Sequence, residues 1–345
     1  MILVMNVGAT NEEIQKTAQQ IETWGHTTNI ARGDIQTVIG IIGDKSDLLG
    51  KPLAALPGVM KVLEVSSSYK RVSRQFHPKD TIVDVNGVKL GGGHKCVIAG
   101  PCSVDTEEYT LQIAKAVKKA GATMLRGGAF KPRTSPYAFQ GHGEDGLKIL
   151  DTARKETGLP IVTELMSLDQ VDVVYKYADV IQIGARNMQN FNLLKEIGKL
   201  GKPVILKNGI ASKAEEHLMS AEYIMAGGLN DVILCLRGVR TYENAFRNCL
   251  DVALVTYLQK ESHLPVIVDS SHSVGKREYV MPVAYAGMAI GADGLILEVH
   301  PNPSCALSDG EQALLPRDFE YLMENLKKIT PWNQREWKEL DKKPL

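Results

Sequence analysis

Apolar and polar positions follow two periodic patterns along most of the chain. From Cys96 onward, short apolar runs such as CVIAG, PIVTEL and PVILKNG alternate with longer segments in which apolar residues recur every three or four positions. The short runs are typical of buried parallel strands, and the longer segments are typical of amphipathic helices. Eight such strand–helix units over about 235 residues predict a (β/α)8 barrel, whose last helix is PRDFEYLMENLKKI.

A doubly wound open sheet is the alternative way to arrange alternating strands and helices. Such a sheet seldom contains eight units, and no G-x-G-x-x-G motif follows the first strand of the series. We therefore expect the barrel, and we place it over residues 96–330. One of its predicted helices is the segment NAFRNCLDVALVTYLQKES, residues 244–262.

The first 70 residues show a different order of elements. A strand in MILVMNV and a helix in NEEIQKTAQQIETWG precede two short β-rich runs, a second helix in SDLLGKPLAALPGV and a last strand in KVLEVSS. The order βαββαβ predicts a ferredoxin-like domain over 1–70. By analogy of fold we interpret it as a regulatory ligand-binding module, and an oligomerisation or capping domain is the alternative.

Two further segments complete the predicted organisation. Residues 71–95 form a linker followed by a hairpin, because VDVNGVKLGGG has an Asn-Gly turn between two short β-rich runs. Residues 331–345 form a polar tail after the last helix.

Composition limits the class of protein. The 345 residues include 40 basic and 40 acidic side chains, so the formal net charge is zero and binding to nucleic acid or to a membrane surface is not expected. Five cysteines without paired spacing favour a reducing, cytoplasmic compartment. The N-terminus does not have the pattern of a signal peptide, and no apolar run is long enough for a transmembrane helix.

Polar or charged side chains stand at the ends of the predicted barrel strands. In chain order they are Cys102, Arg126, Glu164, Arg186, Lys207, Arg237, Asp269 with His272, and Glu298 with His300. The carboxyl ends of barrel strands meet at one mouth, where the active site of this fold lies. Each residue alone is compatible with a strand end that meets solvent, but the whole set predicts one functional site.

Cations form the first group of candidate site residues. They are Arg126, Lys131, Arg133, Arg186, Lys207 and Arg237. Repelling charges in one cavity indicate that anions bind between them, since guanidinium groups bind phosphate or carboxylate as a fork and ammonium groups bind them as point charges. Pairing with acids of the barrel is the alternative, but Glu164 and Asp269 would neutralise only two of the six cations. We therefore expect more than one phosphorylated group, or a phosphate beside a carboxylate.

A thiol, an imidazole and two carboxylates form the second group. They belong to Cys102, His272, Glu298 and Asp309, which are far apart in the sequence, unlike the short ligand pairs of a zinc finger. This mixture of soft and hard ligands suits Mn²⁺, Fe²⁺, Co²⁺ or Zn²⁺ better than Mg²⁺. The alternative is a buried cysteine and a core histidine with satisfied hydrogen bonds.

Taken in order, the motifs resemble those of 3-deoxy-D-arabino-heptulosonate-7-phosphate (DAHP) synthases. They are AGPCS (99–103), LRGGAFKPRTSPYAFQG (125–141), TE (163–164), IGARN (183–187), LKNG (206–209), LRG (236–238), ESHLPVIVDSSH (261–272), EVHPNP (298–303) and LSDG (307–310). The ferredoxin-like extension makes the chain similar to the Iβ subclass. The resemblance covers nearly the whole chain except the C-terminal tail.

The resemblance implies a reaction and a role for each candidate residue. The reaction is an aldol-type condensation of phosphoenolpyruvate with erythrose 4-phosphate, the first step of the shikimate pathway to aromatic amino acids. The resemblance places a divalent metal ion on Cys102, His272, Glu298 and Asp309, phosphoenolpyruvate on Arg126, Lys131, Ala185, Arg186, Lys207 and Arg237, and erythrose 4-phosphate on Arg133, Thr134 and Asp269. The candidate catalytic residues are Lys131, Glu164, Lys207 and His272.

The resemblance also implies regulation and assembly. Tyr or Phe is the expected allosteric inhibitor, bound by the ferredoxin-like domain between subunits, with Asn29, Ala31 and Arg32 as candidate contacts. The expected assembly is a homotetramer. Asp-Pro-Ser-His is common in the family where this chain has Asp269-Ser270-Ser271-His272, so Ser270 is expected to loosen the turn that directs His272.

Two other functions are weighed against this one. A 3-deoxy-manno-octulosonate-8-phosphate synthase joins the same enol to arabinose 5-phosphate, but that family typically has Ala-Asn-Arg-Ser-Ser where this chain has Pro132-Arg133-Thr134-Ser135. A catalytically inactive barrel retained for regulation or partner binding would be expected to lack a metal ligand, and all four are present.

Overall fold

The chain forms two compact units. The computed structural model describes residues 1–33, 36–42, 48, 50–63 and 69–329. Residues 1–80 and the short segment 260–263 belong to the first unit, and residues 81–259 and those from 264 onward belong to the second. The predicted domain boundaries at 70, 95 and 330 remain predictions, and the predicted tail lies outside the described residues.

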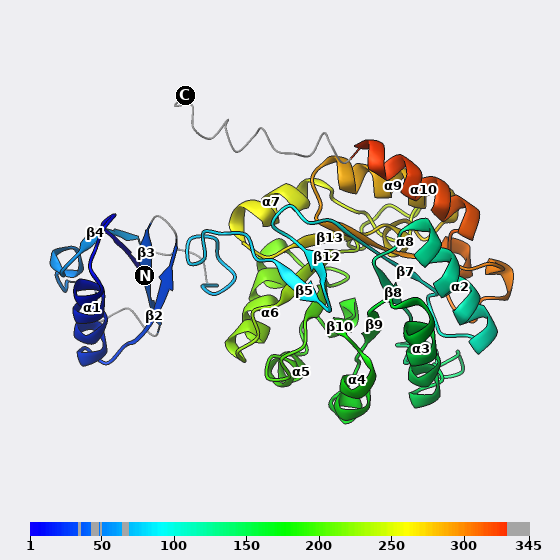
Figure 1. Cartoon of the computed structure of the whole chain (residues 1–345), viewed down its shortest axis with the longest axis horizontal. Coiled ribbons are helices and arrows are strands. Elements are labelled where there is room, and N and C mark those ends of the chain that lie inside the picture. Colours follow the sequence, from blue (N-terminus) through cyan, green and yellow to red (C-terminus); the bar gives the residue numbers. More distant parts are fainter. Residues whose placement is uncertain (34–35, 43–47, 49, 64–68, 330–345) are drawn as a thin grey trace. The chain divides into compact units, whose positions relative to one another are not determined.

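The first unit is built on a four-stranded antiparallel sheet with strand order β2-β3-β1-β4 (Figure 1). Its elements are β1 (Ile2–Met5), α1 (Asn11–Thr23), β2 (Thr27–Arg32), β3 (Thr37–Ile42), η1 (Leu53–Ala55) and β4 (Val59–Leu63). Helix α1 begins after Thr10 because this residue forms a capping box with Glu13: Oγ1 of Thr10 accepts the Glu13 N–H at 3.2 Å, and the Glu13 carboxylate accepts the Thr10 N–H at 2.8 Å.

The core of this unit lies between the sheet and α1. Ile14 and Ile21 of the helix pack in one cluster with Leu3 and Ile39, which face each other across β1 and β3. This arrangement confirms the ferredoxin-like fold. Within the predicted second helix, the described residues contain no α-helix, only the short 3-10 turn η1 and the first residue of β4, and residues 46, 47 and 49 lie outside the described part of the chain.

The second unit is a closed barrel of eight parallel strands, in the order β10-β11-β12-β13-β14-β7-β8-β9. The strands are β7 (Cys96–Gly100), β8 (Met124–Arg126), β9 (Ile161–Glu164), β10 (Val180–Ile183), β11 (Val204–Lys207), β12 (Val232–Leu236), β13 (Val266–Asp269) and β14 (Gly294–Glu298). Every residue of these strands is buried, which explains why most of them appear in the sequence as largely apolar runs. The predicted barrel is confirmed, and the doubly wound alternative is wrong.

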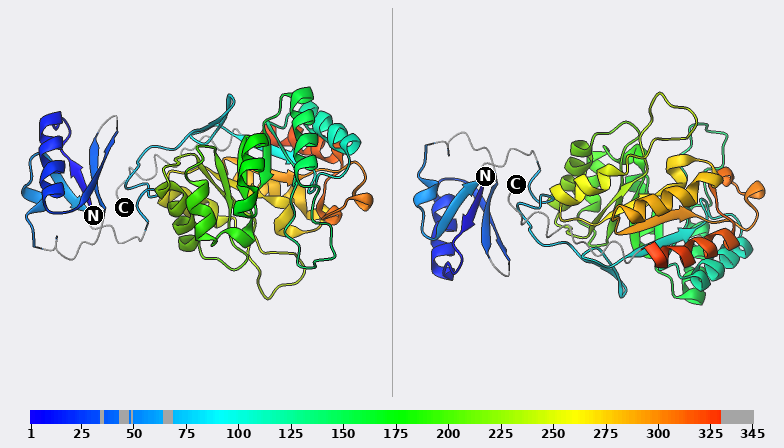
Figure 2. Two further views of the ribbon diagram at one scale, coloured as in Figure 1. Left: turned by 90° about the horizontal axis from the view of Figure 1, so that it is seen from below. Right: turned by 90° about the horizontal axis from the view of Figure 1, so that it is seen from above.

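Helices surround the strands on the outside (Figures 1 and 2). They are α2 (Glu107–Ala120), α3 (Glu144–Thr157), η2 (Leu168–Gln170), α4 (Val171–Tyr177), α5 (Phe191–Ile197), α6 (Ala214–Ala226), α7 (Ala253–Glu261), α9 (Arg277–Ala289) and α10 (Pro316–Ile329). The short elements η3 (Ala185–Asn187), α8 (Ser270–Val274), η4 (Pro303–Cys305) and η5 (Gly310–Gln312) follow strand ends. None of the described helices is long and apolar enough to cross a membrane.

The predicted hairpin is present as β5 (Val83–Val85) and β6 (Val88–Leu90). Its turn residues Asn86 and Gly87 both have positive φ, 50° and 88°, as the tight turn of a two-residue hairpin requires. Val83, Val85 and Leu90 are buried in one cluster with residues of the barrel strands. The hairpin is therefore part of the barrel core.

One predicted helix is wrong in part. Of residues 244–262, only Ala253–Glu261 is helical, and residues 244–252 form an irregular loop after β12. The loop is held by tertiary hydrogen bonds: the N–H groups of Arg247 and Asn248 donate to the carbonyls of Val274 and Ser273, and Cys249 forms a bridge with Val239. These bonds outweigh the local helical pattern of the segment.

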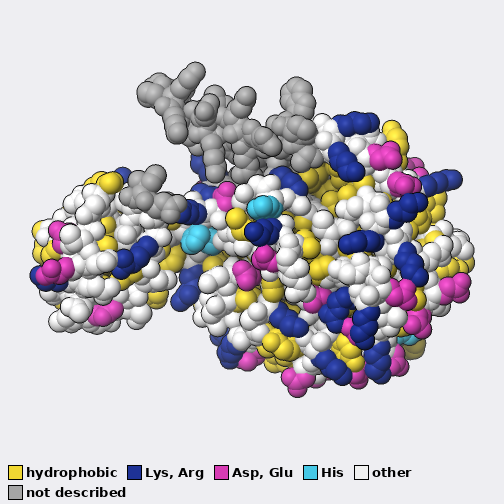
Figure 3. Space-filling model, in the orientation of Figure 1, with side chains coloured by type: hydrophobic (Ala, Val, Ile, Leu, Met, Phe, Trp, Pro, Cys, Tyr) yellow, Lys and Arg dark blue, Asp and Glu magenta, His cyan; other side chains and the backbone are white. Residues whose placement is uncertain are grey.

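The surface of the barrel carries both basic and acidic side chains on the face that Figure 3 shows. In the face drawn in Figure 3, basic and acidic side chains are interspersed over its helices. The six predicted cations are instead found at the mouth.

Candidate active site

A cavity of about 320 Å³ opens at the carboxyl ends of the strands. It is lined by all six predicted cations, namely Arg126, Lys131, Arg133, Arg186, Lys207 and Arg237. Five other predicted residues, Thr134, Glu164, Ala185, His272 and Asp309, also line it. The structure therefore brings together, in one cavity, residues that are spread over 184 positions between Arg126 and Asp309.

Three predicted residues do not line this cavity. Cys102, Asp269 and Glu298 are buried, with at most 4% of their surface exposed. Cys102 and Glu298 contact residues of the cavity wall. Asp269 was expected near substrate hydroxyls, but its carboxylate is occupied by protein groups: Oδ2 lies 2.6 Å from Lys207 Nζ and 2.9 Å from His272 Nδ1, and Oδ1 accepts the His272 N–H at 2.9 Å.

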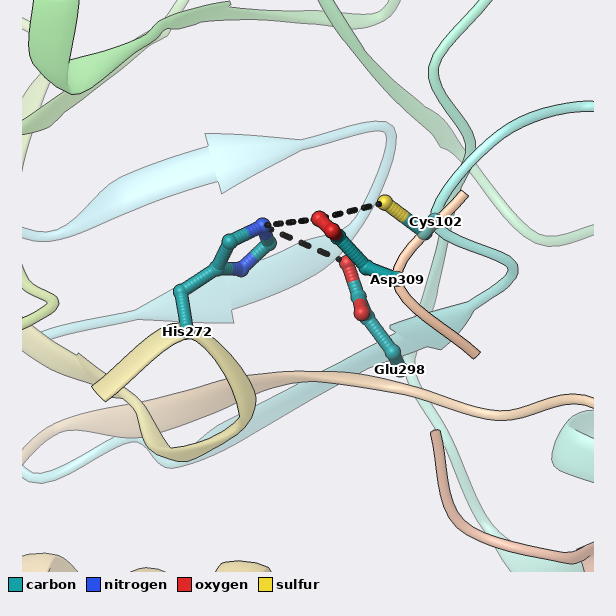
Figure 4. A group of neighbouring side chains, drawn as sticks. All are labelled: Cys102, His272, Glu298 and Asp309. Carbon is teal, nitrogen blue, oxygen red and sulfur yellow. Dashed lines mark hydrogen bonds and ion pairs between the residues drawn. The ribbon is translucent and has the colours of Figure 1, made fainter. Parts of the chain in front are cut away.

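Cys102, His272, Glu298 and Asp309 form the cluster drawn in Figure 4, in which their ligand atoms all lie within 4.8 Å of one another. The Cys102 sulfur lies 3.4 Å from Asp309 Oδ2. His272 Nε2 lies 3.4 Å from Glu298 Oε1 and 3.7 Å from Asp309 Oδ2. One thiol, one imidazole nitrogen and two carboxylates thus converge on a common centre.

Local structure explains how each side chain reaches this centre. Glu298 is the last residue of β14, and Cys102 follows β7 by two residues. His272 stands in the short helix α8, which begins because Asp269 caps it. The turn that directs His272 is thus fully hydrogen-bonded at its cap, although Ser270 stands in it. Asp309 adopts the left-handed conformation, with φ 49° and ψ 32°, which is uncommon for a residue other than glycine.

The environment of His272 suits a metal ligand. Burial lowers its pKa, which favours the neutral imidazole. Its Nδ1 faces Asp269, so Nε2 remains directed at the cluster. A carboxylate behind a ligand histidine is the usual arrangement in metal sites, because it fixes the orientation of the ring. Burial alone would raise the pKa of Asp269, but His272 and Lys207 hold that pKa well below its ordinary value.

Cys102 lies in an environment that a bound cation would suit. Burial and the nearby charges of Glu298 and Asp309 raise the pKa of the thiol to about 12. Two carboxylates that face each other in a buried site repel one another, and a divalent ion between them removes this repulsion. The donor set and its electrostatics therefore fit a divalent metal ion held by these four side chains.

The acids of the barrel neutralise only some of the cations. Arg126 Nη1 lies 2.5 Å from Glu298 Oε1, and Lys207 pairs with Asp269. Within the described residues, Arg133, Arg186 and Arg237 have no acidic side chain within ion-pair distance. The predicted surplus of positive charge is therefore present in the cavity.

Glu164 is held by neutral groups. Gln182 of the neighbouring strand β10 donates from Nε2 to Oε2 of Glu164 at 3.2 Å. A Cβ at Gly184 would lie 2.0 Å from Oε1 of Glu164, so glycine is required there to leave room for the carboxylate. The carboxylate faces the cavity without an ion-pair partner among the described residues.

Arg247 and Gln182 are among the residues of the cavity wall that sequence reasoning missed. Arg247 is a seventh cation, whose Nη1 lies 3.2 Å from Asp309 Oδ2 and 2.9 Å from Gln312 Oε1. It was missed because its segment was assigned to a helix rather than to the loop after β12. Gln182 also lines the cavity, and its signal in the sequence is a polar residue inside the apolar run VIQIGA.

Comparison with known proteins identifies the family. The DAHP synthetase I family matches residues 76–334, and the DAHP synthase ferredoxin-like domain matches residues 1–67. The phospho-2-dehydro-3-deoxyheptonate aldolase of Thermotoga maritima is 48% identical over 95% of this chain and 97% of its own length. A 2-dehydro-3-deoxyphosphooctonate aldolase of Syntrophotalea carbinolica is 33% identical over 67% of this chain and 89% of its own length.

Two solved structures support the same family. A crystal structure of the Thermotoga maritima DAHP synthase has a TM-score of 0.77 at 47% identity and covers 96% of this chain and 97% of that chain. A truncated form of the Thermotoga maritima enzyme has a TM-score of 0.71 at 47% identity and covers 75% of this chain and 95% of that chain. These findings confirm the resemblance indicated by the motifs. The chain belongs to the DAHP synthetase I family and carries the ferredoxin-like domain of DAHP synthases at its N-terminus.

Proposed function

We propose that the chain catalyses the condensation of phosphoenolpyruvate with D-erythrose 4-phosphate and water to DAHP and inorganic phosphate, the first step of the shikimate pathway to aromatic amino acids. The observation that carries the proposal is a single cavity in which seven cations lie beside a thiol–imidazole–carboxylate cluster. Two anionic substrates account for the cations, and membership of the DAHP synthetase I family supports the reaction.

Phosphoenolpyruvate carries a phosphate and a carboxylate, and we assign both to a group of five cations of the cavity. They are Arg126, Lys131, Arg186, Lys207 and Arg237, with the backbone of Ala185 beside them. All of these cations except Arg186 are buried, and charges attract an anion more strongly where water is excluded. Because Arg186 and Arg237 have no acidic partner among the described residues, their guanidinium groups are available to the ligand.

Erythrose 4-phosphate is assigned to the loop after β8. Arg133 is half-buried and Thr134 is exposed, and both line the cavity. Pro132 restricts φ of the loop, which reduces the entropy lost when the loop orders around a phosphate. Asp269 is proposed to act on this substrate only through His272 and Lys207, because both of its oxygens are occupied.

A divalent ion, with Mn, Fe, Co and Zn as the candidate metals, is assigned to Cys102, His272, Glu298 and Asp309. When bound, such an ion acts as a Lewis acid that polarises the aldehyde of the sugar phosphate.

The remaining chemistry is assigned to side chains of the cavity. Carbon 3 of phosphoenolpyruvate forms a bond to the aldehyde carbon, water adds at carbon 2, and phosphate leaves by C–O cleavage. Lys131 lies beside Cys102, and it is proposed to hydrogen-bond to the oxygen that develops negative charge. Glu164 and Lys207 are proposed to manage the protons of the attacking water, and a proton is taken up by the oxygen of the former aldehyde, which becomes a hydroxyl.

Phosphate release with two different aldoses tests the proposed reaction. We expect release of phosphate from phosphoenolpyruvate with erythrose 4-phosphate and little release with arabinose 5-phosphate. Arg133→Gln is expected to raise KM for the aldose at least tenfold and to change KM for phosphoenolpyruvate much less. Tyr137→Ala, in the same loop and 97% exposed, is the matched control. Activity with arabinose 5-phosphate alone would identify an octulosonate-phosphate synthase instead, and no activity with either aldose would favour an inactive barrel.

Regulation, assembly and location complete the proposal. The ferredoxin-like domain is proposed to bind Tyr or Phe as a feedback inhibitor, and the chain is proposed to work in the cytoplasm as a homotetramer. The match of residues 1–67 to the DAHP synthase ferredoxin-like domain supports a conserved module at this end of the chain. A chain that starts at Val83 should keep its activity and lose its sensitivity to both amino acids, and unchanged inhibition would contradict this assignment.

A further inference from the structure

Two loops that carry ligands of the proposed metal site are joined to each other beyond the ligands themselves. Cys102 begins one loop, after β7, and Asp309 lies in the loop after β14. We propose that the buried pair Asp105–His300, together with the contact between Ser103 and Ser308, positions Cys102 against Asp309 and thereby sets the affinity of the site for its divalent ion. This inference rests on the proposed metal site and deepens it.

The first connection stands directly beside the two ligands. The hydroxyl groups of Ser103 and Ser308 are hydrogen-bonded to each other. Ser103 directly follows Cys102, and Ser308 directly precedes Asp309. This hydrogen bond therefore links the two loops immediately beside the two proposed ligands. Ser103 and Ser308 are both buried, which makes their hydrogen bond harder for water to replace.

The second connection lies one step further from the ligands. Oδ2 of Asp105 accepts a hydrogen bond from Nε2 of His300 at 3.1 Å and another from the N–H of Leu307 at 3.3 Å. Asp105 belongs to the loop of Cys102, and the other two residues belong to the loop of Asp309. One buried carboxylate oxygen therefore ties the first loop to two points of the second.

His300 is fixed in orientation from several sides. Its Nδ1 accepts the N–H of Asn302 at 3.1 Å, so its ring proton is on Nε2, the atom that faces Asp105. Its own N–H donates to the carbonyl of Leu314 at 2.9 Å, and the ring of Tyr109 lies 5.4 Å from the imidazole, centroid to centroid. The side chain is 2% exposed and lines none of the cavity that we assign to the substrates, so a direct role in the reaction does not explain it.

Asp309 needs such support because its backbone conformation is one that a residue other than glycine does not favour. Its φ of 49° is in the left-handed region, which costs free energy for a residue other than glycine. The next residue, Gly310, approaches the loop so closely that a Cβ there would lie 2.0 Å from the carbonyl oxygen of Pro303. A loop folded this tightly keeps its conformation only where surrounding contacts determine it, and the Asp105–His300 pair supplies such contacts.

Titration of the metal-free protein with Co²⁺ tests the proposal, because thiolate-to-cobalt charge transfer in the near ultraviolet reports the Cys102–metal bond directly. His300→Leu and Asp105→Asn are expected to weaken Co²⁺ binding about tenfold or more and to reduce the intensity of that band. His300→Gln, whose amide can still donate to Asp105, is expected to restore most of the affinity. His217→Leu is the matched control, since it removes another buried histidine, one that donates to the carbonyl of Leu206, and it should leave Co²⁺ binding unchanged.

The outcomes separate this inference from the metal site on which it rests. If the wild-type protein binds no Co²⁺, or if Cys102→Ala binds Co²⁺ with an unchanged charge-transfer band, the metal assignment itself is wrong. If the wild type binds Co²⁺ through Cys102 and folded His300→Leu binds it equally well, the positioning role is overturned. Should His300→Leu and Asp105→Asn fail to fold, Ser308→Ala decides: we expect about threefold weaker binding, and unchanged affinity would overturn the proposal.

Discussion

The ammonium nitrogen of Lys131 lies 3.1 Å from the sulfur of Cys102 and 3.0 Å from the carbonyl oxygen of the same residue. The cation-lined cavity and the thiol–carboxylate cluster therefore share a border, and Lys131 stands on it. This adjacency places one cation between the cavity that we assign to the substrates and the four side chains that would hold the metal ion. It also means that a change at Lys131 must be tested for its effect on both.

Lys131→Met should separate these two effects. We expect kcat/KM for phosphoenolpyruvate to fall about 100-fold or more, because a buried donor that stabilises developing charge is lost. The variant should still bind one Co²⁺ per chain, since none of the four proposed ligands is changed. A variant that loses Co²⁺ while it still binds phosphoenolpyruvate normally would mean that Lys131 serves the cluster rather than the substrate.

Arg247→Gln should strengthen metal binding. Asp309 Oδ2, which faces both Cys102 and His272, also lies 3.2 Å from Nη1 of Arg247. A guanidinium at that distance competes with a metal ion for the same oxygen, so its removal should raise Co²⁺ affinity several-fold. Arg240→Gln, an exposed arginine of the same loop, should have no effect. Weaker Co²⁺ binding by Arg247→Gln would show that Arg247 orients Asp309 instead of competing for it.

Ser270 and Ser271 are adjacent and buried. Replacing each by alanine should change the free energy of unfolding in opposite directions. The hydroxyl of Ser270 has no hydrogen-bond partner among the described residues, whereas Ser271 Oγ accepts the N–H of Glu298 at 3.0 Å. Ser270→Ala should therefore raise the free energy of unfolding by about 1 kcal/mol, and Ser271→Ala should lower it by about as much. Urea denaturation of the metal-free protein measures both, and equal destabilisation by the two variants would contradict the assignment.

His217 should make stability depend on pH. It is 1% exposed, its Nε2 donates to the carbonyl of Leu206 at 2.9 Å, and burial lowers its pKa to about 4. An unfolded chain has a histidine pKa near 6.5, so above that pH the residue is neutral in both states and contributes no difference. As the pH falls below 6.5, the unfolded state takes up the proton first, and stability is lost by about 2 kcal/mol at pH 5.

The measurement for His217 is a pair of denaturation series from pH 7.5 to pH 5, on the wild type and on His217→Gln. The other titrating groups are common to both proteins, so the difference between the two curves isolates His217. The wild type should lose more stability than the variant as the pH falls. Parallel curves would mean that His217 becomes protonated as readily in the folded protein as in the unfolded one.

Much of the fold follows from the sequence because strands buried on both faces leave a simple signature. All residues of β7 and β14 are buried, and both strands appear as uninterrupted apolar runs. The loop 244–252 could not be predicted in this way. Its apolar residues have helical spacing, but the N–H groups of Arg247 and Asn248 donate to carbonyls of helix α8, which is remote in the sequence.

The residues of the candidate site also divide into those that the sequence predicts and those that only the folded chain reveals. Residues at strand ends, such as Arg186 and Glu298, were found because barrel topology brings strand ends together. His300 was also noticed at a strand end, but its partner Asp105 precedes it by 195 positions, and only the folded chain reveals the pair. Arg247 was missed because the position of a loop residue depends on tertiary hydrogen bonds rather than on local pattern.

Metal titration of catalytic activity tests the central claim most directly. The protein is first freed of metal with a chelator, and phosphate release from phosphoenolpyruvate in the presence of erythrose 4-phosphate is then followed as Mn²⁺ or Co²⁺ is added in known amounts. We predict no activity at the start, a linear rise that ends at one ion per chain, and no rise at all in Cys102→Ala. Full activity in the metal-free protein, or an equal response of Cys102→Ala, would contradict the account.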